Sequence, residues 1–208
     1  YTDPRCRKWF LEHTMRIVGR TNTVTGVPYA EDPTIMAWEL QNEMEGTPEA
    51  AAARRGWFAE VARRIRQVDS NHLVVPGLLG YRLQDERLAW IEMCKLPGVS
   101  YCDQHVYPDE HLRSRGLRNM NRYVDDRVQL AHHVVGKPVV FGEFGFAGHG
   151  GAYGRARWHR RFLQRLFFDG GNGALVWIYQ PTLSWRRRYG ILVDDARHVP
   201  LRRALASA

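Results

Sequence analysis

The stretch Thr34–Glu43, TIMAWELQNE, passes from a short apolar run into two polar side chains, Asn42 and Glu43. An apolar run of this length is typical of a strand that is buried on both faces of a parallel sheet. The stretch Lys137–Phe144, KPVVFGEF, has the same form and carries Glu143 near its end. Two buried strands that each lead into a glutamate indicate a sheet with chemistry at the carboxyl ends of its strands.

Helical and strand-like patterns alternate along the rest of the chain. Helices are predicted over 3–20, 47–68 (with Thr47 as N-cap), 84–94, 117–135 and 155–168, and strands over 34–40, 73–79, 100–107, 137–144 and 174–179. This alternation predicts a parallel sheet covered by helices, for which a doubly wound open sheet and a (β/α)8 barrel are the two common architectures.

The polar residues at the predicted strand ends distinguish these two architectures. Besides the residues already named, they are His105, Tyr107, Trp177 and Gln180. A site assembled from many strand ends is the arrangement of a (β/α)8 TIM barrel. A nucleotide-binding open sheet would need a glycine-rich phosphate turn, and the glycines near 145–154 match it in neither spacing nor context. We therefore predict an α/β fold, with residues 1–208 forming one partial barrel domain.

Composition excludes several classes of partner. The 208 residues carry a net charge of +8, almost all from arginine. The arginines are spread over helix faces among acidic and apolar residues, so we interpret them as solvated outer surfaces and expect no nucleic-acid partner. No stretch is long and apolar enough to span a membrane.

The cysteines and several other titratable residues are expected to be structural. Cys6, Cys94 and Cys102 lack metal-ligand spacing, and Cys94 with Cys102 fits either a disulfide or two free buried thiols. Glu39 lies inside a predicted strand, so we expect a buried, paired carboxylate. Four histidines suggest no ligand set and are expected at the surface: His132, His133, His149 and His159. We expect neither a metal nor an organic cofactor.

Two glutamates at strand ends suit one reaction class in particular. Cleavage of a glycosidic bond needs one carboxyl group to protonate the leaving oxygen and a second to attack, or to activate water, on the other face of the sugar. Glu43 and Glu143 stand at the ends of different strands, and a barrel can bring such strand ends to face each other across a cleft.

Several segments, taken together, resemble glycoside hydrolase family 5, and particularly its endo-β-1,4-mannanases. The segment Tyr29–Glu43, YAEDPTIMAWELQNE, is similar to the fourth-strand signature of that family. The other matching segments are Tyr1–Pro4, Arg20–Gly26, His105–Asp109 (sixth strand), Lys137–Gly145 (seventh strand) and Ala174–Trp177 (eighth strand). They occur in the family's order over about residues 1–195, from the helix before strand four to strand eight.

The resemblance implies a retaining, endo-acting enzyme that cleaves β-1,4-mannosidic bonds in mannan or glucomannan by double displacement. Glu43 matches the general acid/base and Glu143 matches the nucleophile. The resemblance also implies that the protein is secreted. Two alternatives remain open: a β-1,4-glucanase on the same scaffold, and a non-catalytic glycan-binding relic of such a barrel. The mannanase-like segment Tyr29–Leu40 favours mannan.

The same resemblance assigns substrate-binding roles to four further residues. Asn42 would hydrogen-bond the sugar 2-hydroxyl, and Trp177 would form the stacking floor at the cleavage point. Tyr107 would orient the nucleophile, and His105 would contact the acid/base or the substrate. Four aromatic residues in strand-end loops are candidates for outer sugar subsites: Tyr81, Tyr153, Trp185 and Tyr189.

The sequence departs from the family in two places. Met44 and Glu45 follow the acid/base, where the mannanases usually carry proline and then often arginine. The family's first three strands have no counterpart in residues 1–208. Because five strands cannot close a barrel of eight, we expect activity to need an N-terminal barrel segment, covalent or supplied by another chain.

Overall fold

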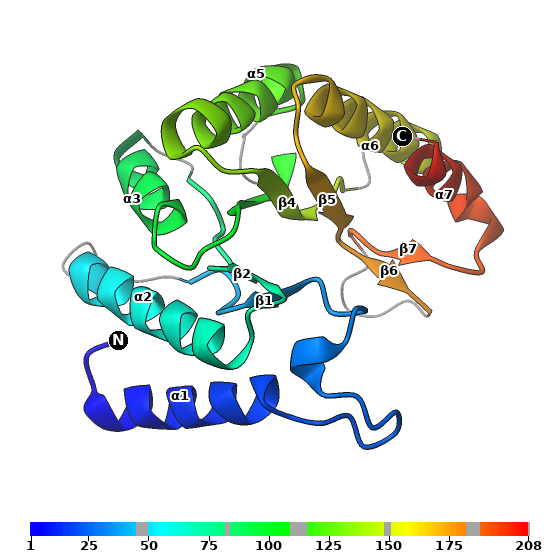
Figure 1. Cartoon of the computed structure of the whole chain (residues 1–208). Helices are drawn as coiled ribbons and strands as arrows, with labels where there is room; N and C mark the ends of the chain where they lie inside the picture. Colours follow the sequence, from blue (N-terminus) through cyan, green and yellow to red (C-terminus); the bar gives the residue numbers. More distant parts are fainter. Residues whose placement is uncertain (45–49, 82–83, 109–115, 148–150, 182–187, 208) are drawn as a thin grey trace. The chain divides into compact units, whose positions relative to one another are not determined.

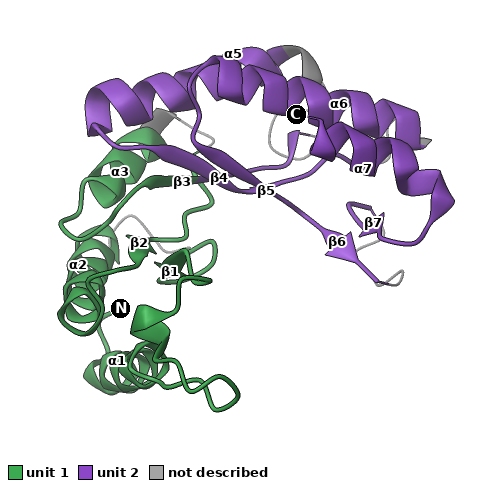
Figure 2. Ribbon diagram, turned by 45° about the vertical axis from the view of Figure 1, so that its right-hand side comes forward, with its two compact units in different colours: residues 1–103 green, residues 104–208 purple. Residues whose placement is uncertain are grey.

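The computed structural model describes residues 1–44, 50–81, 84–108, 116–147, 151–181 and 188–207 (Figure 1). The chain forms two compact units, Tyr1–Asp103 and Gln104–Ala208 (Figure 2). Within the described ranges, no helix is both long and apolar enough to cross a membrane.

The first unit packs helices against a two-stranded parallel sheet. Its elements are α1 (Pro4–Val18), the short helix η1 (Tyr29–Glu31), β1 (Ala37–Glu39), α2 (Ala51–Val68), β2 (Leu73–Val75) and α3 (Gln84–Cys94). Asp3 caps α1, since its carboxylate accepts hydrogen bonds from the backbone N–H groups of Arg5 and Cys6. β1 and β2 run parallel, with Trp38 opposite Val74.

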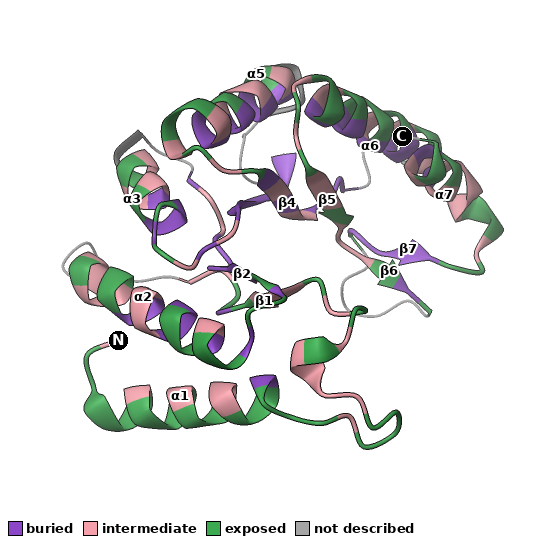
Figure 3. Cartoon of the chain, viewed as in Figure 1, coloured by how far each residue is buried: buried purple, intermediate pink, exposed green. Residues whose placement is uncertain are grey.

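The inner face of α2 supplies much of the core of this unit. Trp57, Phe58, Val61 and Ile65 recur at helical spacing and are buried. Val68 continues the same spacing at the end of α2 but is 46% exposed. Figure 3 shows this face of α2 as buried and its opposite face as exposed. The expected N-cap Thr47 lies outside the described residues.

A polar network lies beneath β1 and β2. The Asp69 carboxylate accepts hydrogen bonds from Trp38 Nε1 (2.6 Å) and pairs with His72 Nδ1 (2.6 Å). His72 Nε2 lies 2.9 Å from the Asp32 carbonyl oxygen. Burial alone would lower the pKa of His72, but its partners Asp69 and Asp32 outweigh burial and raise it. The His72 ring therefore links the turn that carries Asp69 to the Asp32 backbone.

The second unit is built around the parallel sheet β3-β4-β5. The strands are β3 (Cys102–Val106), which begins in the last residues of the first unit, β4 (Val139–Phe144) and β5 (Gly173–Val176). The helical elements are α5 (Gly116–Gln129), η4 (Leu130–Val135), α6 (Gly151–Phe168), η5 (Ala196–His198) and α7 (Val199–Ala206), and a small pair is formed by β6 (Tyr179–Gln180) and β7 (Ile191–Leu192).

Aromatic side chains fill the space between β4 and α6. Phe144 stacks on Phe162 with ring centroids 4.7 Å apart, and Phe141 meets Phe162 edge-on at 5.3 Å. All three side chains are fully buried. The packing holds α6 against β4, the strand that carries Glu143 (Figure 1).

Several strands are shorter or more interrupted than the sequence predicts. The apolar run 34–40 yields only Ala37–Glu39, and Met36 is 55% exposed. Among the described strands β1 pairs only with β2, so one edge of β1 lacks a covering neighbour. The run 174–179 divides into β5 and β6, because the chain turns at Trp177 and Ile178. β7 and α7 were not predicted at all.

The cysteine alternatives are resolved in favour of thiols. Cys94 and Cys102 are both free and fully buried, whereas Cys6 is free and exposed. Burial, and then the neighbouring Cys102, raise the pKa of Cys94.

Candidate active site

Neighbouring strand ends bring Glu143, Tyr107 and His105 together within the second unit. The Tyr107 hydroxyl donates a hydrogen bond to Oε2 of Glu143. Nδ1 of His105 lies 3.8 Å from the same oxygen. The sheet topology explains this meeting, since β3 and β4 are adjacent. His105 is the next-to-last residue of β3, and Tyr107 directly follows that strand.

The side chains around Glu143 are buried, whereas its own carboxylate is partly exposed. His105 and Tyr107 are buried, while the Glu143 side chain keeps 15% of its surface exposed. A hydrogen bond from a phenol to a carboxylate is charge-assisted and therefore stronger than a neutral one. Glu143 is thus held in one orientation while part of its surface remains open to a reactant.

An aromatic cluster backs the tyrosine that holds Glu143. The rings of Tyr107 and Tyr189 lie with centroids 5.0 Å apart, and Ala147 and the half-buried Trp177 complete the cluster. Gly145 is required here, because an added Cβ would stand 2.7 Å from the Trp177 carbonyl oxygen and 3.0 Å from the Tyr189 ring. Only a glycine at position 145 therefore lets the chain after β4 pass this close to the cluster.

Backbone hydrogen bonds extend the sheet into this region. The N–H of Gly145 donates to the Val106 carbonyl (3.2 Å), and the N–H of Trp177 donates to the Phe144 carbonyl (2.8 Å). These two bonds join the carboxyl ends of β3, β4 and β5. They place Tyr107, Glu143 and Trp177 on one rigid framework.

In the first unit, Asn42 and Glu43 follow β1, as the sequence predicts for a strand end. Asn42 is exposed and Glu43 is half-buried. Glu43 has φ of 46°, and among the described residues it is the one non-glycine with positive φ. Gly77, with φ of 74°, lets the chain after β2 approach the Gln41 carbonyl, where a Cβ would stand only 1.5 Å from the oxygen. Strained backbone of this kind is concentrated at functional sites.

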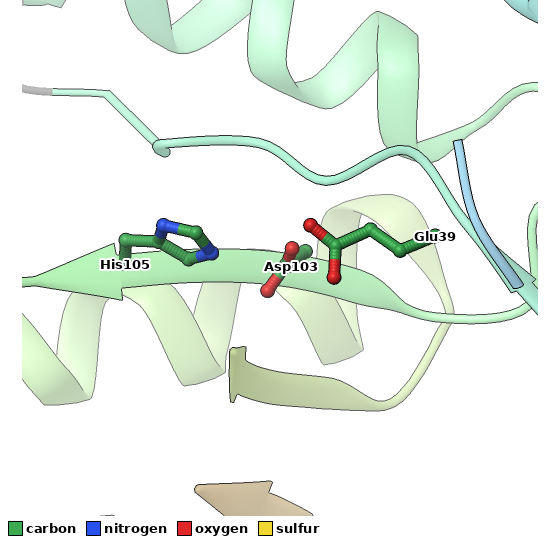
Figure 4. Close-up of side chains that lie close together, drawn as sticks. All are labelled: Glu39, Asp103 and His105. Atoms are coloured by element: carbon green, nitrogen blue, oxygen red, sulfur yellow. The ribbon is translucent and has the colours of Figure 1, made fainter. Parts of the chain in front are cut away.

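The expectation that the Glu39 carboxylate is buried is wrong. Its side chain is exposed rather than buried. Figure 4 shows its carboxylate beside that of the buried Asp103, with His105 further along the same strand as Asp103. Burial, and then the charges of Asp103 and Glu39, raise the pKa of Tyr101.

The pair formed by Glu39 and Asp103 could contribute to a cation site, since each offers a carboxylate oxygen and these lie within 4.8 Å of each other. Two carboxylates supply fewer oxygens than the six to eight that a cation such as Ca²⁺ takes. The arrangement therefore does not by itself define a metal centre.

The expectation that His159 lies at the surface is also wrong. It is fully buried on the inner face of α6, where its ring contacts Phe146 (4.9 Å between centroids) and Phe144 (5.6 Å). Nδ1 lies 2.8 Å from the Arg155 carbonyl oxygen, so Nδ1 carries the proton. Burial lowers the pKa of His159 to about 4.

The other histidines of that set differ from one another. His133 is exposed as expected, and His132 is half-buried, with Nε2 3.1 Å from Oδ1 of Asn172. His149 lies outside the described residues.

The candidate outer-subsite aromatics also differ from one another. Tyr81 is buried and packs on Trp90, and Tyr189 is buried behind Tyr107, so neither ring is available as a platform for sugar. Tyr153 is 80% exposed. Trp185 lies outside the described residues.

Comparison with known proteins identifies the family. A family model described as GH family 5 beta-mannosidase-like matches residues 1–162. The chain belongs to glycoside hydrolase family 5. The chain is 31% identical over 162 residues to mannan endo-1,4-beta-mannosidase 7 of Arabidopsis thaliana, a match that covers 70% of this chain and 38% of that protein. It is also 31% identical over 245 residues to the putative mannan endo-1,4-beta-mannosidase 5 of Oryza sativa subsp. japonica, covering 100% of this chain and 48% of that protein.

Solved structures establish the fold class. The endo-beta-1,4-mannanase from Thermotoga petrophila superposes with a TM-score of 0.83 at 24% identity, covering 99% of this chain and 51% of that one. The endo-1,4-beta-mannanase from Rhizomucor miehei gives a TM-score of 0.84 at 22% identity, covering 99% and 62%. The predicted (β/α)8 TIM barrel is confirmed, and β1 to β5 represent its strands four to eight. The chain spans about 38% to 48% of the length of the two curated relatives described above.

Proposed function

We propose that this chain forms the C-terminal part of the catalytic barrel of a retaining endo-β-1,4-mannanase. The observation that carries the proposal is the hydrogen bond from the Tyr107 hydroxyl to Glu143, beside His105, at adjoining strand ends of a family 5 barrel. Membership of a β-mannosidase-like family and the names of the relatives support mannan as the substrate.

The first step of the proposed reaction forms a covalent intermediate. A carboxylate oxygen of Glu143 bonds to the anomeric carbon while the bond from that carbon to the glycosidic oxygen breaks. Glu43 transfers its proton to the departing oxygen, so the leaving sugar departs as a neutral alcohol. The phenol of Tyr107 fixes one oxygen of Glu143 and so limits the orientations from which attack can occur.

The second step releases the product. Glu43, now ionised, takes a proton from water, and the water oxygen bonds to the anomeric carbon as the bond to Glu143 breaks. Two inversions at the same carbon give net retention. This route places the two carboxyl groups about 5–5.5 Å apart in the assembled site.

Substrate recognition is proposed for three further residues. Trp177 lies half-buried beside the Tyr107 cluster and suits a stacking floor. Asn42 is proposed to hydrogen-bond the 2-hydroxyl, and His105 is proposed to border the same group. In mannose this hydroxyl is axial, so these side chains must leave room for it where a glucanase would accept an equatorial group.

The proposal extends to the whole protein that contains this chain. Because the chain covers five of the eight strands, we propose that activity depends on the preceding part of the barrel. Secretion is part of the same proposal, and detection of the mature protein in the medium of expressing cells tests it.

The test uses the barrel-complete protein, meaning this chain together with the preceding barrel strands that the proposal requires. Hydrolysis of mannan and of carboxymethylcellulose is measured for this protein and its variants. Glu143→Ala and Glu43→Ala are each expected to abolish mannan hydrolysis without unfolding the protein. Azide should partly restore Glu43→Ala on substrates with good leaving groups, since this anion attacks the covalent intermediate without a base to remove a proton from it. The matched control is Glu12→Ala, at an exposed glutamate of α1. Mannan hydrolysis retained by Glu143→Ala or Glu43→Ala contradicts the assignment of these two glutamates. Faster cleavage of carboxymethylcellulose than of mannan by the wild type indicates a glucanase. A wild type that binds mannan without cleaving it indicates the non-catalytic alternative.

A further inference from the structure

Arg155 is a buried arginine whose guanidinium serves three backbone carbonyls. It lies on α6 with 5% of its surface exposed. Nε donates to the Phe146 carbonyl (3.0 Å), Nη1 to the Gly190 carbonyl (3.2 Å) and Nη2 to the Tyr189 carbonyl (2.7 Å). One side chain thus joins two segments of the second unit that are more than forty residues apart in sequence.

Both of these segments lead to the candidate nucleophile. Phe146 follows Glu143 by three residues, on the chain that leaves β4. Tyr189 packs its ring on Tyr107, and Tyr107 donates to Glu143. Moving the backbone at either carbonyl would therefore move a neighbour of the Glu143 carboxylate.

The space around these residues leaves little room for such movement. A Cβ added to Gly145 would meet the Trp177 carbonyl oxygen, the Tyr189 ring and the Tyr107 ring at 3.3 Å or less. A displacement of the Tyr189 segment away from this cluster would remove the wall against which the Tyr107 ring rests.

We propose that Arg155 is a positioning residue of the catalytic site. By fixing the Phe146, Tyr189 and Gly190 carbonyls, it keeps the Tyr107 ring against Tyr189 and thereby keeps the Tyr107 hydroxyl on Glu143. This inference rests on the proposed function in one respect, namely that Glu143 is the nucleophile. Arg155 itself touches none of the reacting atoms.

The chemistry of the side chain suits this task. A guanidinium presents five N–H donors in a rigid planar fork, so one residue can reach three carbonyls in fixed directions. A lysine keeps the positive charge but offers a single nitrogen on a flexible stem, and it cannot reproduce the fork. Arg155→Lys therefore separates the geometry from the charge.

A second arginine provides a matched control. Arg66, on α2 in the first unit, also donates to backbone carbonyls, with Nη1 2.7 Å from the His72 oxygen and Nη2 3.3 Å from the Gly98 oxygen. It makes the same kind of contact far along the chain from Glu143. Arg66→Lys should lower thermal stability while leaving the turnover number unchanged.

The experiment compares kcat and KM for mannan hydrolysis in the barrel-complete enzyme. Arg155→Lys is expected to lower kcat by about tenfold or more, the loss that follows from weakening one hydrogen bond to a charged group. KM should stay within about a factor of two, because substrate contacts are retained. The decisive comparison is with Tyr107→Phe: the double variant should be no slower than Tyr107→Phe alone, since Arg155 acts through Tyr107.

The outcomes separate this inference from the proposed function. Suppose that Glu143→Ala is inactive but Arg155→Lys keeps the wild-type kcat. The positioning role is then wrong and the proposed function stands. The same conclusion follows if the decrease in kcat from Arg155→Lys adds to the decrease from Tyr107→Phe. If Glu143→Ala retains activity, the proposed function is wrong. Should Arg155→Lys fail to fold, Tyr189→Leu removes the same wall without disturbing a buried charge. It must then lower kcat selectively for the positioning role to hold.

Discussion

The buried imidazole of His159 gives the second unit a pH response that can be worked out from the structure. Burial is the main cause that lowers its pKa from 6.5 to about 4. The unfolded chain therefore binds more protons than the folded protein between these two pH values, and stability falls as pH falls through that window. At about 1.4 kcal/mol per pKa unit, the lowering corresponds to about 3 kcal/mol of unfolding free energy lost between pH 6.5 and about 4.

The variant that isolates this effect is His159→Phe. Phenylalanine does not titrate, and it keeps an aromatic ring beside Phe144 and Phe146. Urea unfolding, followed by tryptophan fluorescence at several pH values, gives the unfolding free energy of each protein. The exposed His133 supplies the control variant His133→Gln, which should follow the wild type.

The predicted signature is a difference that depends on pH. Relative to the wild type, His159→Phe should gain about 3 kcal/mol between pH 6.5 and pH 4, whatever its stability at neutral pH. Acid-sensitive carboxylates affect both proteins equally and cancel in this difference. A wild-type minus variant difference that stays constant over the window would refute the reasoning, since it would mean that His159 titrates alike in the folded and unfolded states.

Three further predictions concern other parts of the chain. The raised pKa of His72 adds stability that is fully present below about pH 6.5 and is lost as pH rises through the folded pKa. Replacing His72 with Gln should therefore reduce the loss of unfolding free energy on the alkaline side of a pH profile measured by circular dichroism. In the native protein Cys6 should react rapidly with a thiol reagent, while Cys94 and Cys102 should react only on unfolding, as colorimetric titration will show; rapid reaction of all three would contradict their burial. Residues 1–208 expressed alone should show little or no mannan hydrolysis, and a soluble monomer on size-exclusion chromatography with full turnover would contradict the requirement for the preceding strands.

Local patterns were sufficient for the elements whose burial follows a simple periodicity. The helix expected over 84–94 is α3, Gln84–Cys94, and the inner face of α2 is buried as its spacing predicts. The polar residues at strand ends could also be recognised, because a buried parallel strand tolerates them only where it emerges. Tyr107 and Glu143 were found in this way, although they are thirty-six residues apart.

Other features depend on tertiary contacts that no local pattern carries. His159 falls on the inner face of α6, and its helical spacing from Ala156 and Phe162 could have indicated burial, but residue type alone suggested the surface. Glu39 lies in an apolar run that suggested burial, but its side chain is exposed. The roles of Arg155 and Tyr189 depend on backbone carbonyls and ring contacts brought together by the fold.

The central claim is that Glu143 is the nucleophile, and trapping its covalent intermediate tests that claim most directly. A mannoside with fluorine at C2 and a good leaving group slows release of the intermediate, so the sugar stays attached to the attacking residue. After proteolysis, mass spectrometry of the inactivated barrel-complete enzyme locates the label. The account predicts a single label on Glu143, within the peptide that contains Lys137–Phe144. A label on another carboxylate, or turnover to a product of inverted configuration with no label, would contradict it.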